Sequence, residues 1–199
     1  MSGIGVMCME YFDEDILEAK LELEKQRHTT LDTGIYAGDE LITFVQITLP
    51  NSKIRMFLPE QFIVMPDIVK DVKYPSKDAP NYIITSLSSM VNFGFNILPV
   101  FLETEDIKEM SSQFQKALHN VNPSIRIKNH ENDLVTYRGN EMCWFDFKGY
   151  AIDGQNYNRM YLVRMRNNVL HGVFNCPMQY KEQWEDIVEQ CFLSIEEDI

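Results

Sequence analysis

The chain has 199 residues, of which 45% are hydrophobic and 12% aromatic, which is enough for a packed core and too much for a disordered chain. Its formal net charge is -12, so the phosphate backbone of a nucleic acid would be repelled, and we expect no nucleic-acid partner. The sequence contains no run of about 20 apolar residues that would span a membrane, and a cytoplasmic location is expected.

The first part of the chain contains one predicted helix. Phe12, Ile16, Ala19 and Leu23 recur at helical spacing within residues 10–27. We expect residues 1–30 to form an N-terminal segment that packs on or beside the rest of the protein. No linker rich in Gly, Ser or Pro divides residues 31–199, which are therefore expected to form a single domain.

A short motif follows this segment. Leu31-Asp32-Thr33-Gly34 is similar to the active-site loop of aspartic proteases, whose chemistry needs two carboxylates that share one proton. The sequence holds a single copy, and Gly34 is better explained as a turn residue before the first strand. A hydrolase that uses Asp32, or Asp146, is therefore kept only as the alternative function.

The middle of the chain alternates between strand and helix patterns. Each predicted hairpin is a pair of apolar runs joined by turn residues, and the main predicted helix has acidic residues at its start and basic residues at its end. The expected elements are strands 41–48 and 53–58, a helical turn 67–72, strands 81–86 and 91–98, a helix 105–119 capped by Thr104, and short strands 124–128 and 134–137.

The C-terminal part is the most regular. Three strands are expected over residues 141–152, 157–166 and 169–176, with turns at 153–156 and 167–168. These turns place Trp144 opposite Met165, Lys148 opposite Tyr161, and Tyr150 opposite Arg159. Both faces of the three strands are apolar, as expected when a sheet is covered on both sides.

A final amphipathic helix covers one of these faces. Its apolar residues recur at helical spacing and are Trp184, Ile187, Val188, Cys191, Phe192 and Ile195. Because hairpin connections dominate, we predict an α+β fold with a central, mainly antiparallel sheet covered by helices on both faces, in α/β/α layers.

Two stretches carry a resemblance to a known family. Residues 54–62, a strand followed by Pro59 and an aromatic residue, and residues 170–177, which lead into the helix with Trp184, resemble the PsbP-like group. This group also includes the Mog nuclear-transport factors, and the similarity is closest to uncharacterised bacterial proteins of the same fold. The resemblance implies a binding, accessory or chaperone-like role and supplies no active site to transfer.

The sequence contains no positive support for an enzyme, a metal or a cofactor. Its four cysteines form no Cys-x-x-Cys pair, and its histidines lack the spacing of a zinc site. We therefore expect a non-enzymatic protein-interaction module whose partner is another protein.

The candidate interaction surface lies on the C-terminal strands. Tyr, Trp and Arg dominate interface hot spots, and Tyr150 with Arg159 would form a cation–π pair. The alternative is that these residues pack beneath a helix. The candidate residues are Trp144, Lys148, Tyr150, Arg159 and Tyr161.

Overall fold

The computed structural model describes residues 5–103, 106–129, 134–151 and 154–198. The helices are α1 (Gly5–Lys25), α2 (Asp67–Lys73), α3 (Asp106–Val121) and α4 (Lys181–Leu193), with a 3-10 turn, η1 (Met178–Tyr180), before α4. The strands of the main sheet are β6 (Ile63–Val64), β7 (Tyr82–Thr85), β8 (Asn92–Leu98), β9 (Ile127–Asn129), β10 (Leu134–Val135), β11 (Glu141–Ala151), β12 (Gly154–Arg164) and β13 (Val169–Pro177). The remaining strands are β1 (Thr29–Thr30), β2 (Gly34–Ala37), β3 (Glu40–Ile42), β4 (Phe44–Thr48), β5 (Ile54–Pro59) and β14 (Glu196–Glu197).

The main sheet is antiparallel throughout the described residues. Its strands follow the order β10-β11-β12-β13-β8-β7-β6, and β9 pairs with β11 on the same edge as β10. Short turns join β7 to β8 and β12 to β13, and a short turn can only connect antiparallel neighbours. The predicted antiparallel sheet is therefore confirmed.

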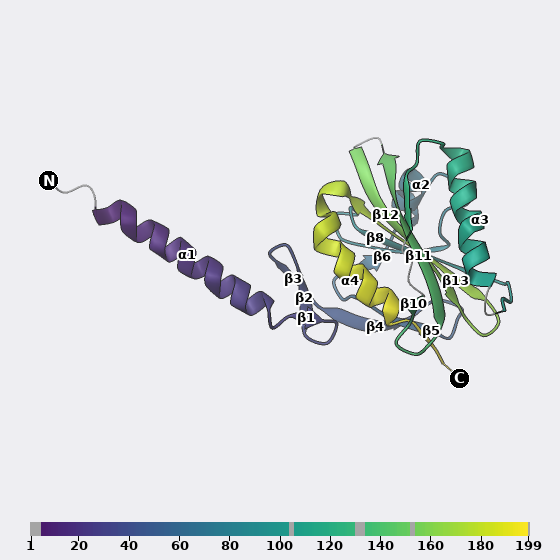
Figure 1. Cartoon of the computed structure of the whole chain (residues 1–199), viewed down its shortest axis with the longest axis horizontal. Coiled ribbons are helices and arrows are strands. Elements are labelled where there is room, and N and C mark those ends of the chain that lie inside the picture. Colours follow the sequence, from purple (N-terminus) through teal and green to yellow (C-terminus); the bar gives the residue numbers. More distant parts are fainter. Residues whose placement is uncertain (1–4, 104–105, 130–133, 152–153, 199) are drawn as a thin grey trace.

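Helices cover this sheet on both faces (Figure 1). On one face α3 buries Ile107 against Leu162 and Val169. On the other face α4 lies across β12 and β13. Every residue of the predicted apolar stripe is buried there, namely Trp184, Ile187, Val188, Cys191, Phe192 and Ile195. The α/β/α layers predicted from the sequence are confirmed.

The prediction of one continuous strand over residues 41–48 is wrong, because the strand is interrupted at Thr43. β3, before the break, pairs with β2, whereas β4, after it, pairs with β5. The two halves thus satisfy their backbone hydrogen bonds in different small sheets. Strand β5 also pairs with β14 and places Ile54, Met56 and Leu58 in the core beneath α4.

The predicted register of the C-terminal strands is also wrong. Trp144 pairs with Tyr161 rather than Met165, and Tyr150 pairs with Gln155 rather than Arg159. Ala151 already pairs with Gly154, so the β11–β12 connection is shorter than the turn expected over residues 153–156. The slip is an even number of residues, and side chains alternate with a period of two, so each residue stays on its expected face.

The N-terminal helix α1 extends away from the layered domain (Figure 1). Its last turn contacts the β2–β3 hairpin, where Lys25 Nζ lies 3.3 Å from Asp39 Oδ1. Ile16, Leu17 and Leu23 on this helix are exposed. The predicted cap and loops at residues 104–105, 130–133 and 152–153 lie outside the described residues.

Candidate functional site

The residues of the predicted interaction surface divide into two groups. Trp144, Arg159 and Tyr161 are buried under α4, as the alternative interpretation expected. Lys148 and Tyr150 lie at the far end of β11 and are exposed. Because Tyr150 pairs with Gln155, it does not face Arg159, and the guanidinium of Arg159 lies instead 5.6 Å from the centre of the Trp144 ring.

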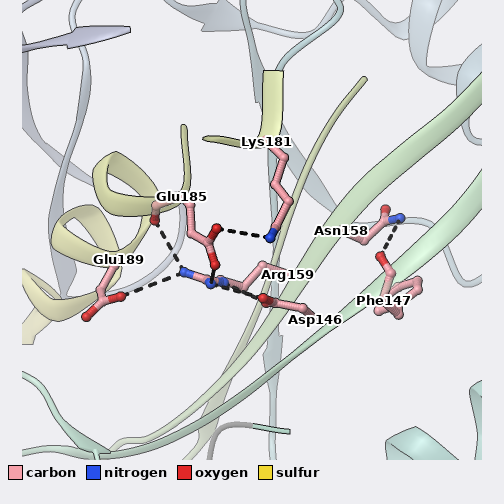
Figure 2. Close-up of polar contacts among 7 residues, drawn as sticks. All are labelled: Asp146, Phe147, Asn158, Arg159, Lys181, Glu185 and Glu189. Atoms are coloured by element: carbon pink, nitrogen blue, oxygen red, sulfur yellow. Dashed lines mark hydrogen bonds and ion pairs between the residues drawn. The ribbon is translucent and has the colours of Figure 1, made fainter. Parts of the chain in front are cut away.

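Arg159 is the centre of a buried ionic network (Figure 2). Its Nε and Nη2 donate to the two carboxylate oxygens of Asp146, on the neighbouring strand β11, at 2.6 and 3.0 Å. On the α4 side, Nη2 donates to Glu185 Oε1 at 2.8 Å, and Nη1 donates to the backbone carbonyl of Glu185 at 3.3 Å. Glu189 lies 3.8 Å from Nη1. The network therefore joins the sheet to the helix that covers it.

The network holds Arg159 in its charged form. Burial works against the charge, but the hydrogen bond and the negative charge of Asp146 outweigh it and raise the pKa of Arg159 above its ordinary value. Both oxygens of Asp146 are occupied by the guanidinium. Asp146 thus orients Arg159 toward the helix, and each of its oxygens already accepts a hydrogen bond from the guanidinium.

The protease-like loop forms a turn between β1 and β2. Thr30 pairs with Gly34 across it, and the Thr33 hydroxyl lies 3.0 Å from that of Thr30. Asp32 is exposed at its tip. Within the described ranges, no group of three or more His, Cys, Asp and Glu side chains is placed to hold a metal ion. Nor is any described helix long and apolar enough to cross a membrane.

A cleft of about 320 Å³ opens at one end of the domain, where four separate segments meet. Its walls come from the β2–β3 hairpin, the turn after β5, the β7–β8 turn and the start of α4. The apolar part is formed by Ile42, Phe62, Val91 and Trp184, and the rings of Phe62 and Trp184 pack with their centres 5.6 Å apart. The volume is at the lower end of the range for small binding sites.

Two features of this cleft are unusual for a surface that only faces water. Gln61 lines the cleft, and its side-chain oxygen is buried and accepts no hydrogen bond from the described residues. A buried acceptor without a donor is costly, and a bound donor would remove that cost. At the rim, Leu87 is 78% exposed and Met90 is 43% exposed. We call the apolar residues Phe62, Leu87, Met90 and Trp184, together with Gln61, the cleft site.

Little in the sequence indicated the cleft site. Leu87 and Met90 fall in the predicted turn between strands 81–86 and 91–98, and Phe62 is the aromatic residue that follows Pro59 in the sequence. The one local signal was two large apolar side chains in a turn, a place where polar residues are the norm. Their proximity to Trp184 depends on the way α4 crosses the sheet.

Comparisons with known proteins identify the fold. No protein-family model and no curated protein matches the sequence. The solution structure of cyanobacterial PsbP from Synechocystis is similar with a TM-score of 0.57 and 11% identity, over 83% of this chain and 98% of that one. LpqN of Mycobacterium tuberculosis, described as involved in cell envelope biogenesis, matches with a TM-score of 0.48 and 12% identity, over 82% of this chain and 94% of that one. The chain therefore has a PsbP-like fold, and at these identities the likeness extends to the fold alone.

Proposed function

We propose that this PsbP-like domain is a non-enzymatic interaction module that binds an extended segment of a partner protein at the cleft site. The observation that carries the proposal is the exposure of Leu87 and Met90 beside a cleft with an apolar floor. Large apolar side chains that flank a concave surface are characteristic of protein-binding sites.

The chemistry of the cleft defines the segment that would fit. The packed rings of Phe62 and Trp184 offer a surface for one large apolar anchor side chain. The unpaired oxygen of Gln61 would accept a hydrogen bond from a backbone N–H beside that anchor. Since the chain carries a net charge of -12, basic residues flanking the anchor would speed association.

The hydrolase alternative lacks comparable support. Asp32 is exposed on a turn, and both oxygens of Asp146 are bound to Arg159. A catalytic carboxylate needs a second group within hydrogen-bond reach and a pocket that positions the substrate. The cleft site contains neither of these aspartates.

The test is to select peptides that bind the whole chain from a displayed library of linear sequences. Their affinity is then measured by fluorescence anisotropy for the wild type and two variants. The double variant Leu87→Asp, Met90→Asp should bind at least tenfold more weakly, the loss expected when anchor contacts worth about 1–2 kcal/mol are removed. Val121→Asp is the matched control, because Val121 is 86% exposed and lies at the end of α3, outside the cleft.

A third variant tests the hydrogen bond. Gln61→Leu removes the buried oxygen and should weaken peptide binding while leaving the free energy of unfolding unchanged or higher, because an unpaired buried acceptor is lost. The proposal fails if the library yields no peptide above background, or if the selected peptides bind the Leu87→Asp, Met90→Asp variant as well as the wild type.

A further inference from the structure

The helix α1 presents apolar side chains to solvent along one side. Ile16 is 45% exposed and Leu23 is 56% exposed. Beyond its last turn, no other described part of the chain lies beside this helix (Figure 1). Most helices in proteins are stabilised by packing of an apolar face rather than by the backbone alone. The exposed side of α1 is therefore a surface that lacks its packing partner within the described chain.

The spacing of these residues is that of a two-stranded coiled coil. Ile16, Ala19 and Leu23 follow one another at intervals of three and four residues, which are the a, d and a positions of a heptad. In the sequence, Phe12 continues the same spacing as the preceding d position. We call Ile16, Ala19 and Leu23 the α1 seam. A β-branched residue such as Ile16 at an a position favours a pair of helices over a larger bundle.

Charges beside the α1 seam match a parallel pair of identical helices. Within the helix, Asp15 and Glu22 occupy g positions, and Lys20 occupies the e position that follows Asp15. When two copies lie parallel, each g residue faces the e residue five positions later on the other helix, which brings Asp15 to Lys20. An antiparallel pair would instead bring acidic g residues together. The charge pattern thus selects both the partner and its direction.

The attachment of α1 to its own domain leaves the seam free. Lys25 lies at a c position, contacts Asp39 and lies 6.0 Å from the centre of the Tyr36 ring. Leu21, at an f position on the side opposite the seam, is half-buried. The domain is therefore contacted by the outer side of the helix, and the α1 seam faces away from these contacts.

We propose that α1 pairs with α1 of a second copy of this chain as a parallel two-stranded coiled coil, so that the protein is a homodimer joined through its N-terminal helices. This pairing buries the apolar seam and forms the Asp15–Lys20 ion pair twice, once on each side of the twofold axis. It is independent of the cleft site, which lies on the layered domain.

Sedimentation equilibrium of the full chain at micromolar concentration tests the pairing. The wild type should show twice the chain mass of 23.3 kDa. The variant Ile16→Lys, Leu23→Lys should sediment as a monomer, because like charges would meet at the a positions. Leu17→Lys is the matched control: Leu17 is 64% exposed at an outer b position, so this variant should remain a dimer. Each variant should keep the unfolding transition of the domain, since the seam lies outside it.

Two further variants test the charges and the direction. Lys20→Glu should raise the dimer dissociation constant about tenfold or more, and Asp15→Lys added to it should restore the wild-type value. In a Cys8→Ser background, Leu23→Cys should form an interchain disulfide on mild oxidation, since a parallel pair places the two introduced thiols face to face. A monomeric wild type, a Leu17→Lys variant as disrupted as the seam variant, or failure of the Leu23→Cys variant to cross-link would overturn the proposal.

Discussion

Removal of the Asp146 charge should be strongly destabilising. In Asp146→Asn the guanidinium of Arg159, whose side chain is 1% exposed, would lose its buried carboxylate partner. Removing one partner of a buried ion pair costs about 3–5 kcal/mol, because the other charge stays buried. Glu185 and Glu189 would still lie near Arg159. We therefore expect the free energy of unfolding to fall by about 3 kcal/mol, the lower end of this range. With a urea m-value of about 3 kcal/mol/M, the unfolding midpoint would fall by about 1 M.

The measurement is urea unfolding followed by circular dichroism, with two comparisons. Asp146→Asn, Arg159→Met removes both buried charges and should lie within about 1 kcal/mol of the wild type. Glu141→Gln breaks the half-exposed pair that Glu141 forms with Arg164 at 2.7 Å on the same sheet, and should cost at most about 1 kcal/mol. If Asp146→Asn costs no more than Glu141→Gln, the network does not act as a buried ion pair.

Two other predictions concern the two faces of the sheet. A Cβ at Gly172 would overlap a ring carbon of Phe192. The variant Gly172→Ala should therefore lower the free energy of unfolding, measured in urea, by about 1–3 kcal/mol. Adding Phe192→Leu should recover part of that loss. On the α3 face, burial lowers the pKa of His171 from 6.5 to about 4. Between these two pKa values only the unfolded chain takes up the proton, so the free energy of unfolding should fall by up to about 3 kcal/mol as the pH drops from 7 to 4. The variant His171→Phe should remove this part of the pH dependence. Equal pH profiles for the two proteins would show that His171 does not cause it.

The network around Arg159 also bears on the cleft site. It fixes the middle of α4 to β11 and β12, while the first turn of the same helix supplies Trp184 to the cleft. A buried ionic contact adds little net stability but penalises other packings of the same elements. We therefore regard the network as the feature that sets where α4 crosses the sheet, and hence the shape of the cleft.

The sequence by itself determined the layers of this protein. Side-chain periodicity reports burial directly, because a helix or strand that covers a core repeats its apolar residues with its own period. The stripe from Trp184 to Ile195 therefore predicted both α4 and its buried face, and the apolar run over residues 91–98 predicted β8. Those patterns are local, and tertiary contacts did not override them.

Tertiary structure alone decided which residues meet. The β11–β12 register depended on a connection shorter than the turn residues indicated, and as a result Arg159 lies beside Asp146 rather than Tyr150. The same holds for the cleft, whose walls come from residues as distant in the chain as Ile42 and Trp184. Pairing between distant segments depends on how whole elements dock, and no local pattern encodes it. For this reason the sequence predicted that Trp144 and Tyr161 lie on an apolar face, while only the fold showed that α4 covers them.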